Sequence, residues 1–162
     1  MEGFKFLELG AGTGFILLFA AIKGAIVTAT DISPLAIENL QLNAGLNNQT
    51  MQVIESDLFT KIPPQTFDII IIPPPYFPKK PSSVAEYAWY CGEDFEYFRN
   101  LFNQIDKFIH TGTRILMILS DDCDIQTISA ISSENGFIMN KILSKKVFWE
   151  WNFIFEINFV LT

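Results

Sequence analysis

A glycine-rich segment near the start of the chain has the residue types and spacing of a nucleotide-binding turn. Gly10, Gly12 and Gly14 lie between an apolar run at residues 5–9 and a second apolar run, typical of a helix, at residues 15–22. Glycine allows positive φ angles and a close approach to a ligand, and the first N–H groups of a following helix are free to bind that ligand. The segment therefore predicts a strand, a ligand-binding turn and a helix.

An aspartate after the next apolar run extends this pattern. Asp31 follows residues 25–30 directly and lies 17 residues past Gly14, a position suited to accept hydrogen bonds from ribose hydroxyls. The turn and Asp31 alone fit a nicotinamide cofactor equally well. Two features favour another nucleotide. The spacing G-x-G-x-G removes the tight contact that the third glycine of a dinucleotide site makes with its helix. In addition, three prolines at 73–75 precede Tyr76, which a dehydrogenase does not need.

Apolar periodicity predicts alternating strands and helices along the chain. The last two strands are joined without a helix and should therefore be antiparallel. The pattern predicts a doubly wound, mostly parallel α/β sheet of seven strands, Rossmann-like, with a C-terminal antiparallel hairpin. Strands are predicted at residues 5–9, 25–30, 51–55, 67–72, 114–119, 138–143 and 151–161, helices at 15–22, 35–44 (beginning after Ser33 and Pro34 and closed by Gly45), 94–109 and 124–135, and a loop at 79–90.

The residues suited to chemistry each follow a predicted strand. The glycine turn, Asp31, Asp57 and the prolines from Pro73 onward all stand at the carboxyl end of one. Ligands of open α/β sheets bind outside these carboxyl ends. The sequence therefore predicts that the functional residues meet at one edge of the sheet.

Several other notable residues are interpreted as structural. Alternating apolar residues in the last strand are predicted to face the core, and His110 stands near a predicted helix end, where a cation is stabilised by the helix dipole. The two lysine doublets, Lys79-Lys80 and Lys145-Lys146, are interpreted as solvated surface. The alternating core residues are Trp151, Phe153, Phe155, Ile157 and Phe159.

Composition limits the classes of protein and partner. The chain has 162 residues, 49% of them hydrophobic, which suits one domain spanning residues 1–162 with a substantial core. The longest apolar run, residues 15–22, is too short to span a membrane, and Glu2 argues against a secretory signal. Cys91 and Cys123 have no metal or redox spacing, so a cytoplasmic protein without a bound metal is expected. A net charge of −7 disfavours binding to nucleic acid.

The combined motifs resemble those of the class I S-adenosylmethionine-dependent methyltransferases. The series is Leu-Glu-Leu-Gly-Ala-Gly-Thr-Gly, Ala-Thr-Asp31, Glu-Ser-Asp57-Leu-Phe, and Phe-Asp-Ile-Ile-Ile-Ile-Pro-Pro-Pro-Tyr76-Phe. The segment from Cys91 to Arg99 and the order of elements after it are most similar to the release-factor glutamine methyltransferases and their relatives that methylate exocyclic amines. The resemblance covers almost the whole chain.

This resemblance implies S-adenosylmethionine as cofactor and a role for each motif. The turn glycines would border the methionine portion, Asp31 would hold the ribose, and Asp57 would contact the adenine amine with Leu58 near the ring. The family reaction is a direct in-line displacement at the sulfonium methyl group, in which the protein mainly places and desolvates the reactants. The implied cofactor residues are Glu8, Gly10, Ala11, Gly12, Thr13, Gly14, Asp31, Ile32, Asp57 and Leu58, and the implied catalytic residues are Pro73, Pro74, Pro75 and Tyr76.

The chain departs from the family pattern at two places. Pro73 stands where the family has Asn or Asp, whose side chain accepts a hydrogen from the target nitrogen; the carbonyls of Pro73 and Pro74 and the ring of Tyr76 remain. Met1 also lies only a few residues before the first strand, whereas relatives have preceding elements that cover the cofactor and recognise substrate. The resemblance therefore implies that such elements are missing or come from a partner chain.

Three functions agree with these features. The leading hypothesis is methyl transfer to a protein side chain or a small molecule. The second is methylation of an exocyclic base amine in nucleic acid, which requires flipping the base out of its stack. The third is a catalytically weak or inactive module that binds the cofactor or a partner chain.

Overall fold

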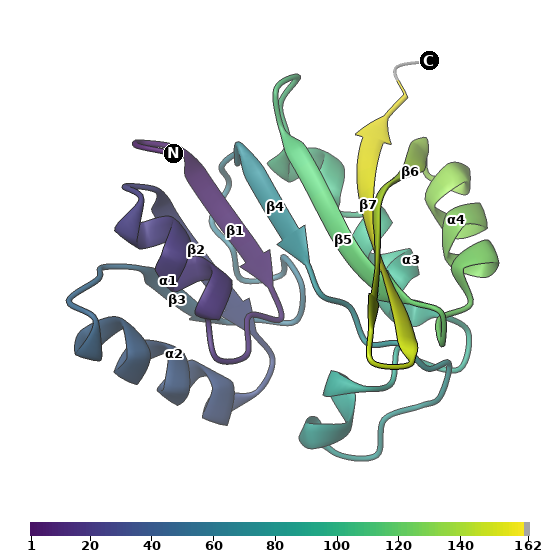
Figure 1. Ribbon diagram of the computed structural model, residues 1–162, viewed down its shortest axis with the longest axis horizontal. Helices are drawn as coiled ribbons and strands as arrows, with labels where there is room; N and C mark the ends of the chain where they lie inside the picture. The colour runs from purple at the N-terminus through teal and green to yellow at the C-terminus, as the bar shows by residue number, and fades with distance from the viewer. Residues whose placement is uncertain (161–162) are drawn as a thin grey trace. The chain divides into compact units, whose positions relative to one another are not determined.

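The computed structural model of the chain describes residues 1–160, and within them seven strands form a sheet in the order β3-β2-β1-β4-β5-β7-β6 (Figure 1). The mostly parallel sheet with an antiparallel C-terminal hairpin confirms the predicted fold class. The strands are β1 (Lys5–Leu9), β2 (Ile26–Asp31), β3 (Gln52–Glu55), β4 (Ile69–Ile72), β5 (Arg114–Ser120), β6 (Phe137–Val147) and β7 (Glu150–Phe159). The helices are α1 (Phe15–Ile22), α2 (Pro34–Leu46), α3 (Glu96–Phe102) and α4 (Ile125–Glu134), with 3₁₀ helices η1 (Val84–Ala88) and η2 (Ile105–Phe108).

The chain forms two compact units, of which the first comprises residues 1–71 and 107–113. In this unit β1 pairs in parallel with β2 and with β4, and β2 pairs in parallel with β3. Parallel pairing brings the carboxyl ends of these strands to one edge of the sheet. Helices α1 and α2 pack on one face of it, and the buried cluster between helices and strands is Phe6, Ala11, Leu17, Ala20, Val27, Ala29 and Leu40.

Helix α1 has the bounds that the sequence predicts, but it buries only part of its apolar surface. Leu17 and Ala20 face the sheet, whereas Phe15, Phe19 and Ile22 are exposed.

None of the described helices combines the length and the apolar content that crossing a bilayer requires.

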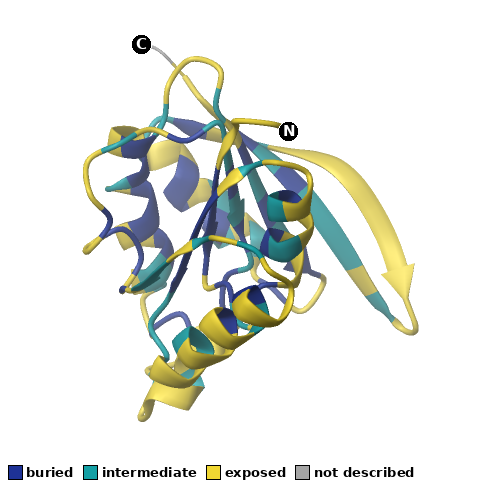
Figure 2. Ribbon diagram, turned by 90° about the vertical axis from the view of Figure 1, so that its left-hand side faces the viewer, coloured by how far each residue is buried: buried dark blue, intermediate teal, exposed yellow. Residues whose placement is uncertain are grey.

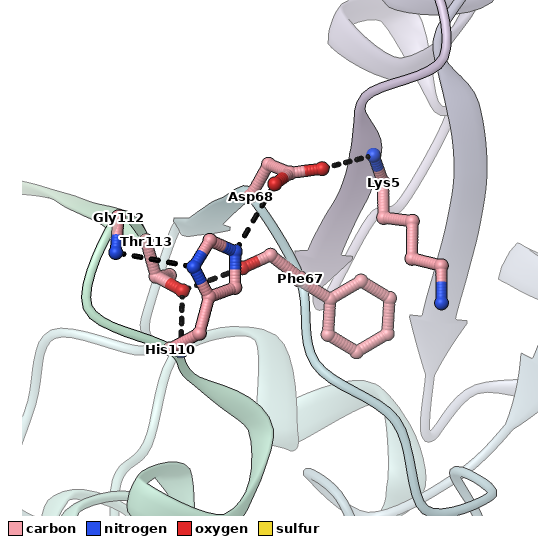
Figure 3. Close-up of polar contacts among 6 residues, drawn as sticks. All are labelled: Lys5, Phe67, Asp68, His110, Gly112 and Thr113. Atoms are coloured by element: carbon pink, nitrogen blue, oxygen red, sulfur yellow. Dashed lines mark hydrogen bonds and ion pairs between the residues drawn. The ribbon is translucent and has the colours of Figure 1, made fainter.

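A polar cluster fixes the amino ends of β1 and β4 within the first unit (Figure 3). One carboxylate oxygen of Asp68 accepts the Lys5 N–H at 2.7 Å, and the other lies 3.0 Å from Nε2 of His110. Because the Gly112 N–H donates to Nδ1 of His110, Nε2 is the donor to Asp68. The hydrogen bond from the Lys5 N–H, and to a lesser degree His110, hold the pKa of Asp68 below its usual value. The partner of His110 is thus a carboxylate, at the strand ends opposite the glycine turn.

The second unit comprises residues 72–106 and the chain from residue 114 onward. Here β7 lies between β5 and β6 and is antiparallel to both. Helix α4 packs against β6 and α3 packs against α4. Phe102 of α3 contacts Phe137 of β6 with ring centroids 5.7 Å apart, and both are fully buried. Aromatic and aliphatic side chains of both helices therefore form the core of this unit.

Two predicted helix boundaries are wrong. Helix α2 continues through Gly45 to Leu46, with Asn47 as its C-cap. The predicted helix at residues 94–109 is divided into α3 and η2, with a turn between them in which the Gln104 N–H bonds to the Leu101 carbonyl. Apolar residues are buried on both sides of this turn, including Ile105 and Phe108. Periodicity alone therefore could not reveal the interruption.

The last hairpin also differs from the prediction. Strand β6 runs to Val147, past the predicted end at Leu143, and has an irregular register between Lys141 and Leu143. Phe155 and Ile157 are in the core as predicted, but Trp151 and Phe159 are more than 40% exposed. Alternation places side chains on one face, whereas burial depends on what covers that face. The predicted end of the last strand at Leu161 lies outside the described residues.

Candidate active site

The glycine turn follows β1 in the first unit and is hydrogen-bonded to β2. Gly10, Gly12 and Gly14 all have positive φ angles, of 72°, 54° and 73°. The N–H groups of Gly10 and Ala11 both donate to the carbonyl of Thr30, at 2.8 and 2.9 Å. The turn therefore has the left-handed backbone for which the sequence supplies glycine.

Asp31 holds the turn in place. Its Oδ2 accepts the Gly12 N–H at 3.0 Å, and its Oδ1 accepts the Ser33 N–H at 2.9 Å. The carboxylate thereby links the glycine turn to the start of α2. Since each carboxylate oxygen can accept more than one hydrogen bond, Asp31 retains capacity for a ligand.

Gly12 and Gly14 serve different purposes. A Cβ atom on Gly14 would lie 2.4 Å from Cδ2 of Leu40 in α2. Gly14 thus lies close to α2, whereas the prediction from its spacing concerned α1, the helix that follows the turn. A Cβ atom on Gly12 would meet no described atom within 4 Å. Gly14 is therefore favoured by its positive φ and by the closeness of Leu40, whereas Gly12 faces open space.

Glu8, near the end of β1, has a buried carboxyl group, one oxygen of which has no partner among the described residues. Its side chain is 4% exposed, and Oε2 forms no hydrogen bond with any described residue. Burial, and to a lesser degree the negative charge of Asp31, together raise the pKa of Glu8 to about 8. A cationic ligand group would compensate this carboxylate. The ammonium and sulfonium groups of S-adenosylmethionine have that charge, so the residues of the turn fit this cofactor.

We expect Glu8 to make stability fall with rising pH in the ligand-free protein. The folded state retains the Glu8 proton up to pH about 8, whereas the unfolded chain releases it near the ordinary glutamate pKa of 4.5. The free energy of unfolding should therefore fall between about pH 5 and 8, by at most about 1.4 kcal/mol per pH unit. Urea unfolding at several pH values measures this slope. Glu8→Gln should flatten it; the same flattening by Glu38→Gln, on the exposed side of α2, would contradict the assignment.

The remaining predicted cofactor residues also lie in the first unit. Ser56, just after β3, donates its N–H to the Asp31 carbonyl at 2.9 Å, which places Asp57 next along the chain with an exposed carboxylate. Leu58 is buried and has a positive φ of 47°. Ala11 is buried, Ile32 is half-buried, and the carbonyl of Thr13 accepts Nδ2 of Asn43 at 2.9 Å. The structure thus gathers the predicted cofactor residues at the carboxyl ends of β1, β2 and β3.

Sequence reasoning missed three residues that hold this site. The N–H of Ser33 follows Asp31 by two residues, which is the spacing of an Asx turn and a usable signal. The Thr30 carbonyl and the Asn43 amide act through backbone position and through the packing of α2. Nothing in their residue types indicates these contacts.

The predicted catalytic residues belong to the second unit and form a loop that is held by backbone hydrogen bonds to Trp89. Pro74 and Pro75 are buried, and Pro73 and Tyr76 are half-buried. The Trp89 carbonyl accepts the N–H groups of Tyr76 and Phe77 at 3.1 and 2.9 Å. Burial, with nearby acidic groups and a thiol, raises the pKa of Tyr76. Its phenol is therefore neutral near pH 7, suited to stacking and to donating a hydrogen bond.

The predicted loop at residues 79–90 contains helix η1. The carboxylate of Glu86 accepts both the N–H and the Oγ–H of Ser82, at 2.7 and 2.8 Å, and so closes this helical turn. Cys91, just beyond it, donates its N–H to the Phe77 carbonyl at 2.9 Å. Burial raises the pKa of the Cys91 thiol to about 11 and also raises that of Cys123. Both thiols are therefore protonated near neutral pH and poorly suited to act as nucleophiles.

Comparison with known proteins identifies the family. Residues 2–89, more than half of the chain, match the family model described as methyltransferase small domain. The chain belongs to the methyltransferase small domain family. It is 40% identical over 93 residues to a protein named as a protein N5-glutamine methyltransferase of Methanocaldococcus jannaschii, covering 54% of this chain and 47% of that protein. It is 35% identical over 100 residues to the release factor glutamine methyltransferase of Deinococcus radiodurans, covering 56% and 36%.

Solved structures share the fold of this methyltransferase small domain. A methyltransferase from Pyrococcus furiosus has a TM-score of 0.74 at 24% identity, covering 96% of this chain and 75% of that one. A Bacteroides fragilis S-adenosylmethionine-dependent methyltransferase, in complex with S-adenosyl-L-homocysteine, has a TM-score of 0.69 at 22% identity, covering 99% and 74%. The chain spans about half or less of the curated relatives named above.

Proposed function

We propose that this chain binds S-adenosylmethionine and transfers its methyl group to the side-chain amide nitrogen of a protein glutamine. The observation that carries the proposal is the glycine turn held open by Asp31 beside the buried carboxyl group of Glu8, whose Oε2 has no hydrogen-bond partner among the described residues. Such a turn suits a nucleoside that carries an amino acid with positive charge. The acceptor is inferred from the similar proteins of Methanocaldococcus jannaschii and Deinococcus radiodurans, which are named as glutamine methyltransferases.

The proposal gives each group of residues one task. Glu8 and the turn glycines hold the methionine end, Asp31 the ribose, and Asp57 and Leu58 the adenine. When bound, S-adenosylmethionine supplies an electrophilic methyl group on a positively charged sulfur. The Pro73 and Pro74 carbonyls orient the acceptor amide by accepting its N–H, and the Tyr76 ring stacks on the amide plane. Placement and exclusion of water are then the main contributions of the protein.

Two experiments test the cofactor and the acceptor. Calorimetry should show binding of S-adenosylmethionine and not of NAD; preferential binding of NAD would overturn the proposal. Transfer of a radiolabelled methyl group into cell extract should label the protein fraction. Label in the nucleic-acid fraction alone would favour the second candidate function, methylation of a base amine. That candidate is supported by a tRNA adenine methyltransferase of Haemophilus influenzae, which is 32% identical over 78 residues. We also propose that residues 1–162 form one methyltransferase domain; two separate unfolding transitions would contradict this.

We expect Pro73→Asn to raise the rate of methyl transfer. Asparagine restores a side-chain acceptor for the target nitrogen, which is worth about 1–3 kcal/mol if the bond forms in the transition state, or roughly a ten- to hundredfold gain. Single-turnover transfer to a glutamine-containing protein acceptor measures it. Pro78→Asn, an exposed proline in the same loop, serves as the control. Equal rates for the two variants would remove the proposed role of position 73.

A further inference from the structure

The hairpin of β6 and β7 ends in two aromatic residues that nothing in the described structure covers. Phe148 and Trp149 connect the strands and are 85% and 86% exposed, with ring centroids 5.7 Å apart. Phe148 also has a φ of 57°, a conformation that is unfavourable for a bulky residue and that Asn or Gly adopts more easily. Stability of the turn therefore does not account for an aromatic residue at this position.

Positive charge is concentrated on the same hairpin. The hairpin, residues 137–159, contains three lysines and two glutamates, a net charge of +1, whereas the rest of the chain carries −8. The lysines are Lys141, Lys145 and Lys146 on β6. Most residues of β6 are exposed, as Figure 2 shows along the outer strand of the hairpin. Lys145 and Lys146 thus place exposed positive charge near the tip, beside Glu150 and Asp121, whose Oδ1 accepts the Trp151 N–H at 3.0 Å.

Cations and aromatic rings are interleaved on one face of the hairpin. Nζ of Lys146 lies 5.9 Å from the ring centroid of Trp151, its cross-strand partner, and Nζ of Lys141 lies 4.8 Å from that of Phe153. The opposite face contains an apolar hollow at the tip. The hollow is lined by Ile118, Leu143, Val147, Phe148, Trp149 and Ile154, with Lys145, Glu150 and Asn152 as its polar members.

The charge pattern decides between partners for this surface. β6 is last in the strand order, so its outer edge has no neighbouring strand among the described residues. A second copy paired along this edge would bring the lysines of both copies together, which is destabilising. A negatively charged partner with planar apolar groups satisfies both the lysines and the exposed rings. Single-stranded nucleic acid combines these properties, because bases stack on aromatic side chains while phosphates meet lysines.

We propose that the hairpin tip binds single-stranded RNA, with unpaired bases stacked on Phe148 and Trp149 and phosphates at Lys145 and Lys146. RNA is the partner because its loops and ends present bases that are already unstacked. The lysine doublet at 145–146, interpreted from the sequence as solvated surface, then has a binding role. This surface belongs to the second unit, whereas the glycine turn belongs to the first.

Fluorescence anisotropy with a labelled 12-nucleotide uridine RNA tests this on the full chain. Affinity should fall with salt, with a slope of log K against log salt of about −1.4, as expected for two phosphate contacts on a single strand. Trp149→Leu keeps apolar bulk but loses stacking, and should weaken binding about tenfold. Lys145→Glu/Lys146→Glu should weaken it by more. Phe148→Asn should raise the melting temperature, because Asn adopts the positive φ at this position more easily, and should weaken RNA binding, because the stacking ring is lost. Opposite effects on the two measurements separate binding from folding.

Matched controls make the result decisive. Lys23→Glu/Lys107→Glu changes the net charge equally at exposed lysines of the first unit and should leave most of the binding intact. Equal losses in the two double variants, or equal affinity for polyglutamate, would overturn the proposal, because charge alone would account for binding. Equal or tighter binding of single-stranded DNA of the same length would overturn the choice of RNA. S-adenosylmethionine binding by the hairpin variants, measured by calorimetry, should be unchanged, so failure here is distinguishable from failure of the proposed function.

Discussion

Gly12→Ala is expected to weaken binding of S-adenosylmethionine strongly while the protein still folds. The new Cβ would point into space that no described atom occupies, so the fold tolerates it. The same space is the proposed position of the cofactor, and a methyl group there would exclude it. We expect the dissociation constant to rise by at least tenfold, or about 1.4 kcal/mol. Isothermal titration calorimetry with S-adenosylmethionine measures this change.

Gly3→Ala provides a matched control for backbone strain. Gly3 also has a positive φ, of 75°, and a Cβ there would likewise meet nothing within 4 Å. Both variants should lose about 1–2 kcal/mol of unfolding free energy, because both force alanine into the left-handed region. Only Gly12→Ala should lose the cofactor. If Gly3→Ala weakens binding to the same degree, strain rather than occupied space is responsible.

Asp31→Ala is expected to reduce both stability and cofactor binding. Removing the carboxylate leaves the N–H groups of Gly12 and Ser33 without their acceptor, in a region that is partly buried. The expected cost is about 2–4 kcal/mol of unfolding free energy, since each lost partner of a charged acceptor costs about 1–3 kcal/mol. Asp31→Asn keeps one acceptor oxygen and should cost about half as much. Urea unfolding measures stability, and calorimetry measures S-adenosylmethionine binding.

Asp124→Ala is the corresponding control in the second unit. Asp124 accepts the N–H and the Oγ–H of Thr127, at 3.0 and 2.7 Å, and so caps α4 with two hydrogen bonds. Its loss should also destabilise the protein, by about 0.5–2 kcal/mol. Binding of S-adenosylmethionine should remain. If Asp31→Ala retains wild-type affinity at a temperature where it is folded, the proposed role of this aspartate in the cofactor site is wrong.

Local patterns in the sequence were sufficient for the fold class and for the position of the glycine turn. Helix α1 has the bounds that periodicity predicts, and glycines stand at three positive φ angles of the turn. These features depend on short-range properties, namely side-chain period and backbone freedom, which each segment carries by itself. The antiparallel last hairpin is likewise determined by a connection too short for a crossover.

Features that depend on distant parts of the chain were decided by the tertiary structure. The missing partner of Glu8 and the tether from Asp31 to Gly12 follow from how β1 and β2 are paired, which no local pattern contains. Trp151 has the same alternation as Phe155 but is exposed, because burial depends on what covers a face. The tip residues Phe148 and Trp149 became notable only once the hairpin showed nothing packed against them. Sequence thus determined which groups are present and where the chain turns, whereas long-range packing decided which of those groups remain unpaired and available to a ligand.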